Sequence, residues 1–179
     1  MKWVVHGERT VYSNTWLSVN LADVELPDGR HLDHYLLRQR PIVTCAILDS
    51  ADRVLLLWRH RFIADIWGWE LPSGVVDGKD FDLVASAARE AEEETGWRPT
   101  SLEPLMDLLP AAGLSDCVNH VYWTERAEYV GPPVDAHESS RIEWVPLKEI
   151  PDLVGRGHVC ESSMVAALLR LYVMRVVGD

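Results

Sequence analysis

Three glutamates near the middle of the chain are the residues whose types and spacing best predict chemistry. Glu90, Glu93 and Glu94 stand at i, i+3 and i+4, the spacing that places side chains on one stripe of a helix. Neighbouring carboxylates repel, and near a helix C-terminus the backbone dipole costs each exposed charge about 0.3–1 kcal/mol. A hard divalent cation such as Mg2+ or Mn2+ removes that cost, because it prefers oxygen ligands. The spacing predicts a metal site; the alternative is a solvated acidic face.

The segment that carries these carboxylates is expected to be a helix. From Asp82 to Thr95 the small and apolar residues recur with helical period, and Gly96 follows as a stop signal. Arg89 stands four residues before Glu93 and can pair with it. The side expected to approach a sheet consists mostly of small residues, namely Val84, Ala87, Ala88, Ala91 and Thr95.

Other kinds of metal site fit the sequence poorly. The histidines and cysteines show no zinc-ligand spacing. An EF-hand loop counted from Asp77 would need a glutamate at its twelfth position, where Ala88 stands. An oxygen-rich site for Mg2+ or Mn2+ is therefore the metal site that the sequence favours.

The residues from Gly74 to Trp97 resemble the Nudix box, G-x5-E-x7-R-E-U-x-E-E-x-G-U with U apolar. In its first half the distance from Gly74 to Arg89 is one residue longer than the pattern. Asp80 stands nearest to the place of the first glutamate, so a metal ligand at that place is left open. The second half matches at each fixed position, with Arg89, Glu90, Ala91, Glu93, Glu94, Gly96 and Trp97.

Segments outside the box are similar to the ADP-ribose pyrophosphatase branch of the Nudix family. They are Leu26–Arg30, Leu55–Arg61 and Trp69–Gly74. The segment Pro110–Asp116 is similar to the Pro-Ser-Pro-Gly loop of that branch, but Ala112 replaces the second proline. The resemblance therefore covers most of the chain.

The resemblance implies a role for each residue around the metal. Glu90, Glu93 and Glu94 are expected to ligate Mg2+, or Mn2+, together with the backbone carbonyl of Ser73. Arg89 is expected to orient the glutamates, and Arg89 and Glu93 belong to the expected catalytic set.

The resemblance also implies a general base from the loop that precedes the last strand. Asp135, His137 and Glu138 stand in that loop. Glu138 is favoured, because a carboxylate beside a divalent metal suits proton abstraction. The alternative is an acidic loop that is merely solvated.

Arg59, Arg61 and Glu70 are candidates for substrate binding. Two arginines that alternate at a strand end are suited to clamp a diphosphate, although they could equally be surface charges. Glu70 precedes the box and is expected to contact substrate or metal, or else to form a buried ion pair. Tryptophans that could stack on a nucleobase, if they are not core residues, are Trp16, Trp67 and Trp69.

Composition narrows the class of protein. The net charge of -11 disfavours binding to a nucleic-acid backbone. The three cysteines form no C-x-x-C pair, which indicates a reducing, cytoplasmic location. Residues 1–14 lack the apolar segment of a signal peptide, and Met164–Val177 is too short and too charged to span a membrane. We expect a soluble protein without nucleic-acid or membrane partners.

The order of elements predicts a mixed α/β fold. The resemblance refines this to a Nudix-type α/β/α sandwich with a mixed β-sheet and extra N-terminal antiparallel strands. Residues 1–40 are expected to be a strand extension in a homodimer interface, and residues 41–179 the Nudix hydrolase domain. Strands are predicted at 11–25, 31–38, 42–48, 54–58, 67–72, 102–109, 118–126 and 142–145, with helices at 82–95, 146–153 and 162–177, the last capped by Ser162.

These features lead to an expected function. The chain is expected to hydrolyse ADP-ribose, or a related nucleoside diphosphate linked to another moiety, to AMP and ribose 5-phosphate with Mg2+. Alternatives within the family are an NDP-sugar, a dinucleoside polyphosphate, a nucleoside triphosphate or a coenzyme. An alternative of another class is a nucleotide-binding sensor without catalysis, which the departures at Asp80 and Ala112 favour and the retained carboxylates oppose.

Overall fold

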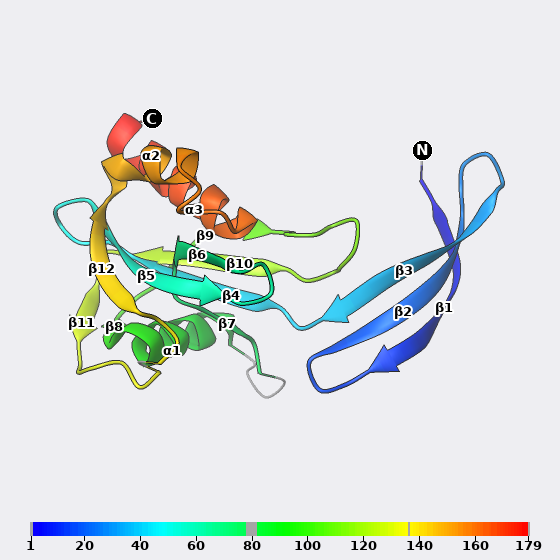
Figure 1. Cartoon of the computed structure of the whole chain (residues 1–179), viewed down its shortest axis with the longest axis horizontal. Coiled ribbons are helices and arrows are strands. Elements are labelled where there is room, and N and C mark those ends of the chain that lie inside the picture. Colours follow the sequence, from blue (N-terminus) through cyan, green and yellow to red (C-terminus); the bar gives the residue numbers. More distant parts are fainter. Residues whose placement is uncertain (1, 78–81, 136, 179) are drawn as a thin grey trace. The chain divides into compact units, whose positions relative to one another are not determined.

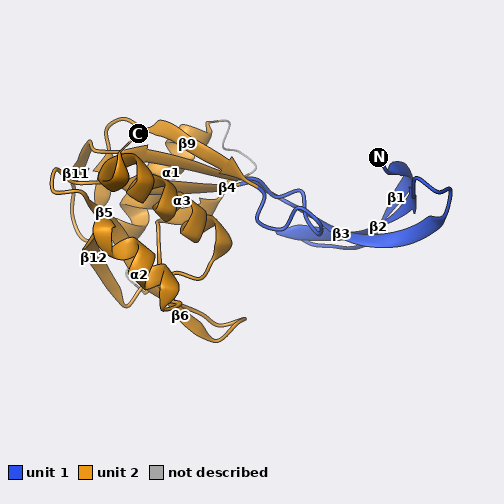
Figure 2. Cartoon of the chain, turned by 90° about the horizontal axis from the view of Figure 1, so that it is seen from above, with its two compact units in different colours: residues 1–41, 109–118 blue, residues 42–108, 119–179 orange. Residues whose placement is uncertain are grey.

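The computed structural model describes residues 2–77, 82–135 and 137–178 and divides into two units. Unit 1 comprises Met1–Pro41 and Leu109–Val118, and unit 2 comprises Ile42–Leu108 and Asn119–Asp179 (Figure 2). Unit 1 therefore contains, besides the N-terminal segment, a short segment from the middle of the chain.

Unit 1 is built on an antiparallel sheet in the order β1-β2-β3. Its strands are β1 (Val4–Ser13), β2 (Leu17–Glu25) and β3 (His31–Gln39). The predicted single run from Val11 to Glu25 was wrong. The chain turns between β1 and β2 because the Asn14 side chain accepts hydrogen bonds from the N–H groups of Trp16 and Leu17 at 2.8 and 3.0 Å.

Unit 2 contains the remaining strands in three sheets (Figure 1). Their orders are β7-β4-β10-β9, β12-β5-β6 and β11-β8. Strands β4 and β10 are parallel and the other pairs are antiparallel, so the predicted mixed sheet is confirmed. The bounds are β4 (Ile42–Ile47), β5 (Arg53–Arg61), β6 (Ile66–Glu70), β7 (Ser73–Val75), β8 (Trp97–Pro99), β9 (Glu103–Leu108), β10 (Asn119–Thr124), β11 (Ala127–Tyr129) and β12 (Arg141–Pro146).

Helices cover both faces of the unit 2 strands, as the predicted α/β/α sandwich requires (Figure 1). One face of β4 packs with α1 and the other with α3, because alternate side chains of a strand point to opposite faces. On the α1 side, a cluster of buried apolar residues includes Val43 and Ile47 of β4 and Ala87 of α1. On the α3 side, another cluster includes Ala46 of β4 and Leu168 of α3. The helical segments are α1 (Leu83–Thr95), η1 (Leu147–Glu149), α2 (Ile150–Gly155), α3 (Ser162–Tyr172) and η2 (Val173–Val177).

Two local expectations about the helices were wrong. Glu161, not Ser162, caps α3, because its side chain accepts a hydrogen bond from the Met164 N–H at 2.9 Å. Val84 is 40% exposed rather than packed on a sheet, since it lies in the first turn of α1. Among the described residues, no helix is long and apolar enough to cross a membrane.

Candidate active site

Helix α1 has a capping residue at each end. Asp82 caps its start by accepting hydrogen bonds from the Val84 and Ala85 N–H groups at 2.9 and 3.2 Å. Gly96 ends it with a φ of 75°, and its N–H donates to the Glu92 carbonyl at 2.8 Å. The predicted helix and stop signal are therefore confirmed, and the glutamates lie in its last turns.

Glu90 lies against β7, the strand that precedes the helix in the sequence. A Cβ atom added to Gly74 would lie 2.1 Å from Glu90 Cδ and 2.3 Å from Oε2. The glycine therefore leaves the space that the carboxylate fills. Burial raises the pKa of Glu90, against the opposing charge of Arg89.

Glu94 is the most buried of the three carboxylates that the sequence singled out, at 4% exposure. Its Oε2 accepts a hydrogen bond from the Ser73 N–H at 3.0 Å, and its Oε1 lies 2.6 Å from Arg59 Nη2. Burial raises the pKa of Glu94 to about 7, although Arg59 and the Ser73 N–H both act in the opposite direction. A buried carboxylate with this pKa is well suited to ligate a cation, because the metal's positive charge compensates the carboxylate's negative charge where water does not.

Arg59 is buried and has hydrogen-bonding capacity to spare. Its side chain is 5% exposed, and Nη2 lies 2.6 Å from Glu94 Oε1 and 3.7 Å from Glu138 Oε2. Within the described residues, its Nε and Nη2 nonetheless make no hydrogen bond of good geometry. Unmet buried donors are costly, so this guanidinium is suited to receive an additional anionic group.

Arg89 joins the other two carboxylates. Its Nη1 donates to Glu93 Oε2 at 2.7 Å, which confirms the pairing predicted from their spacing. Its Nη2 lies 2.8 Å from Glu90 Oε1. The structure therefore places one guanidinium across Glu90 and Glu93, where the sequence predicted an orienting residue.

The loop that carries the candidate base is attached to the C-terminal end of α1. The N–H groups of Val134 and Asp135 donate to the Glu93 carbonyl at 2.8 and 3.1 Å, and so satisfy a helix-end acceptor. One ligand atom each from Asp135, His137 and Glu138 lies within 4.8 Å of the other two. Because Glu138 also lies beside Arg59, the structure brings the favoured base to the carboxylate site.

The close approach of this loop explains the second glycine of the box. A Cβ atom added to Gly96 would lie 1.9 Å from the Gly131 carbonyl oxygen. The Val130 N–H donates to the Gly96 carbonyl at 2.9 Å. Gly96 therefore serves both the left-handed helix end and the packing of the loop that carries Glu138.

Arg61 and Glu70 form an ion pair with each other. Arg61 Nε and Nη2 donate to the two Glu70 oxygens at 2.8 and 2.5 Å, and Glu70 is 4% exposed. The hydrogen bond from Glu70 raises the pKa of Arg61. This is the ion pair that the sequence left open as the alternative for Glu70, with Glu70 buried and Arg61 about half exposed, and it lies on neighbouring strands β5 and β6.

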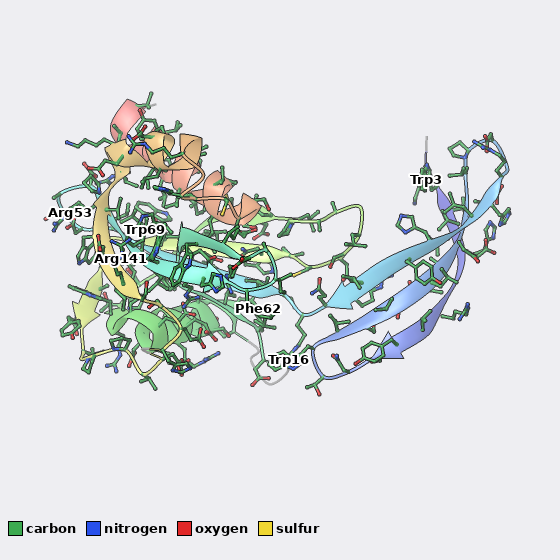
Figure 3. All side chains as sticks on the ribbon, viewed as in Figure 1. Trp3, Trp16, Arg53, Phe62, Trp69 and Arg141 are labelled. Atoms are coloured by element: carbon green, nitrogen blue, oxygen red, sulfur yellow. The ribbon has the colours of Figure 1, made fainter. Side chains whose placement is uncertain are left out.

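The tryptophans considered for base stacking differ in exposure. Trp69 is 7% exposed, and the Arg141 guanidinium lies 5.1 Å from its ring centroid (Figure 3). It is therefore a core residue of unit 2. Trp16 in unit 1 and Trp67 in unit 2 are 65% and 49% exposed.

Two features of the site could not be predicted from the sequence, and one candidate residue lies outside the described part of the chain. The Arg59–Glu94 contact joins β5 to α1, and the helical spacing of the glutamates carries no signal for it. The hydrogen bond from the Ser73 N–H to Glu94 also has no signal in the sequence, while the expected role of the Ser73 carbonyl as a metal ligand stays a prediction. Asp80 lies outside the described residues.

Comparison with known proteins gives matches along the chain. A NUDIX domain matches residues 38–168, and a nucleoside diphosphate sugar hydrolase N-terminal domain matches residues 3–37. CMP-5'-(N-acetyl-N-hydroxy-3-aminopropyl)phosphonate hydrolase of Streptomyces rubellomurinus is 40% identical over 169 residues, which is 94% of this chain and 82% of that protein.

More distant relatives match over similar lengths. An ADP-ribose pyrophosphatase of Mycobacterium tuberculosis is 26% identical over 168 residues, covering 93% of this chain and 81% of that protein. The crystal structure of an ADP compounds hydrolase superposes with a TM-score of 0.76 at 20% identity, covering 96% of this chain and 92% of that chain. The structural match confirms the expected fold.

Proposed function

The chain belongs to the Nudix family of pyrophosphohydrolases, and we propose that its carboxylate site uses Mg2+, or Mn2+, to hydrolyse ADP-ribose to AMP and ribose 5-phosphate. The broader activity is cleavage of a phosphoanhydride bond in a nucleoside diphosphate derivative. The observation that carries the proposal is the convergence of Glu90, Glu93 and Glu94 with the buried, under-bonded Arg59.

The residues present fit a hard divalent cation. The proposed side-chain ligands Glu90, Glu93 and Glu94 are all oxygen donors, which Mg2+ prefers. The Glu90 carboxylate occupies space that only a glycine at position 74 leaves open. When bound, Mg2+ supplies charge neutralisation at phosphate oxygens and lowers the pKa of a coordinated water.

The remaining side chains are assigned by their positions. Arg89 holds Glu90 and Glu93 in place, and Arg59 offers unmet N–H donors to a phosphate oxygen of the substrate. Glu138 accepts a proton from the attacking water at its carboxylate, since the loop places it beside Arg59. Positioning and charge stabilisation are the main sources of rate in phosphoryl transfer.

The Arg61–Glu70 ion pair has a different proposed role. With both Glu70 oxygens bonded to Arg61, we assign the pair to shaping the substrate side of the β5–β6 hairpin. Arg61 is about half exposed at the side chain, so it keeps a face for a substrate phosphate.

A second substrate is favoured by a specific observation. The relative with 40% identity is named for a compound in which CMP is joined to a phosphonate. Cleavage of that compound and of ADP-ribose would both release a nucleoside monophosphate. A CMP-linked phosphonate is therefore the second candidate, within the same reaction type.

The substrate is tested by product identification. The chain is incubated with Mg2+ and, separately, ADP-ribose, a CMP-linked alkylphosphonate, a UDP-sugar and ATP. Release of AMP and ribose 5-phosphate as the fastest reaction supports the first candidate. Faster release of CMP favours the second, and nucleotide binding without any cleavage overturns hydrolysis in favour of a sensor.

We also propose that unit 1 provides a homodimer interface. Every residue of β1 is exposed, and edge strands of this kind invite pairing with another chain. Exposed apolar side chains lie on both faces of β1 and just before it, where a second copy could cover them: Trp3, Val4, Val5, Val11 and Tyr12. The three cysteines are free thiols, which supports a cytoplasmic location.

A further inference from the structure

A group of histidines and acids gathers on one face of the unit 1 sheet, and the strand register explains why. Glu25 on β2 lies opposite His31 on β3, so their side chains share a face. Asp23 lies two residues before Glu25 and therefore on the same face. A register shift between Val5 and Gly7 leaves His6 without a partner on β2.

The side chains of this group are in direct contact. His6 Nε2 lies 2.6 Å from Glu25 Oε2, and the His6 and His31 rings stack with centroids 5.1 Å apart. His31 Nδ1 lies 2.8 Å from Asp23 Oδ1. One ligand atom each from His6, Glu25 and His31 lies within 4.8 Å of the other two.

We propose that His6, Glu25 and His31 form a second metal site, for a divalent cation that prefers imidazole, with Zn2+ as the best fit. Two imidazoles and one carboxylate, with water in the fourth position, are a recognised donor set for tetrahedral Zn2+. Modest side-chain movement brings the three ligand atoms from their present spacing to a common ion.

Asp23 completes the arrangement as an orienting residue. Because His31 Nδ1 faces the Asp23 carboxylate, Nε2 is the ring nitrogen left for a metal. A carboxylate that holds the far nitrogen of a ligating histidine fixes the ring orientation and raises its basicity. In agreement with this contact, the hydrogen bond to Asp23 raises the pKa of His31.

This site differs in chemistry from the carboxylate site on α1. Zn2+ favours imidazole nitrogen, whereas Mg2+ favours oxygen and retains its water. The two sites also belong to different units of the chain. Saturating Mg2+ should therefore fill the carboxylate site while leaving the histidine site open to Zn2+.

The test is a Zn2+ titration of the full chain by calorimetry in excess Mg2+. Mildly alkaline pH is used, because the metal must displace any proton on His31. One Zn2+ is expected to bind to the wild type and to raise its unfolding temperature. His6→Ala and His31→Ala should lose that binding, and Asp23→Asn should weaken it by about 10- to 100-fold.

The matched control is His34→Ala, because His34 also lies on β3 but points to the opposite face from His31. This variant should bind Zn2+ as the wild type does. A second measurement needs no substitution, namely the shift of the His6 and His31 imidazole resonances on addition of Zn2+. Equal Zn2+ affinity in the wild type and in His6→Ala/His31→Ala, or unshifted resonances, overturns the proposal.

Discussion

At the scale of single residues, the site is a set of charges that compensate one another incompletely. Arg89 pairs with Glu90 and Glu93, but Glu94 and Arg59 meet in a buried place where the arginine retains unmet donors. The proposed cation and the substrate phosphates supply what is missing. Burial raises the pKa of Glu94 to about 7, because removal from water disfavours the charged form of the carboxylate.

Arg59→Lys should reduce kcat/KM by about 10- to 100-fold, because an ammonium group lacks the planar, bidentate arrangement of N–H donors that a guanidinium offers to a phosphate. Mg2+ binding should change less, since the positive charge beside Glu94 remains. Steady-state kinetics and Mg2+ titration of the same preparation separate these effects. An unchanged kcat/KM would remove Arg59 from the substrate site.

The metal-free protein should lose stability as pH rises, because of Glu94. Its pKa is 4.5 before burial and about 7 in the folded chain, so between these values the folded state holds a proton that the unfolded state has lost. The resulting loss in the free energy of unfolding is roughly 3 kcal/mol. This loss is absent below pH 4.5 and complete above about pH 7.

Glu94→Gln removes this titration while keeping an acceptor for the Ser73 N–H. Thermal unfolding in a chelator, followed from about pH 5 to pH 8, should therefore show a steeper decline in the wild type than in the variant. Identical pH dependence in the two proteins would contradict the assigned pKa.

At the scale of elements, short turns and helix ends set the geometry of the site. The helix from Asp82, its stop at Gly96 and the strand from Ile42 could be predicted, because local periodicity and capping residues encode them. The bounds of β1 could not, because all its residues are exposed and no apolar alternation marks a buried face.

In the site, too, local contacts could be predicted and contacts between distant segments could not. The spacing of Arg89 and Glu93 is local, so their pairing followed from the sequence. Arg59 meets Glu94 only through the packing of β5 beside α1, which no local pattern specifies. Strands β7, β8 and β11 were not predicted, because three residues are too few to show the alternation of apolar and polar side chains that marks a strand.

Gly74→Ala should weaken Mg2+ binding while leaving the chain folded. Its Cβ would lie 2.1 Å from Glu90 Cδ, so the carboxylate must move away from its present position. We expect a loss of metal affinity of about 10- to 100-fold, comparable to the effect of disturbing residues that orient a ligand. The control is Gly155→Ala, where an added Cβ meets no atom within 4 Å among the described residues. Equal Mg2+ affinity in both variants would contradict the role of Gly74.

At the scale of the whole molecule, the two units carry different features. Unit 2 holds the carboxylate helix, Arg59 and the base loop, whereas unit 1 presents exposed apolar side chains on β1. A monomer that exposes such a strand risks uncontrolled association, which a specific dimer prevents.

Val5→Asp should therefore shift the chain from dimer to monomer in analytical ultracentrifugation, because it places a charge in the proposed interface. Val5 is 61% exposed within one chain. Ile63→Asp is the matched control, since Ile63 is 88% exposed but belongs to unit 2. A wild-type chain that sediments as a monomer would exclude this interface.

We propose that the carboxylates of α1 hold the cation that drives hydrolysis. This is tested by release of nucleoside monophosphate from the fastest-cleaved substrate of the panel, measured with Mg2+ for the wild type and for Glu93→Gln/Glu94→Gln. We expect metal-dependent release in the wild type and its loss in the double variant, with the variant still folded by circular dichroism. Undiminished release by the folded double variant would contradict it.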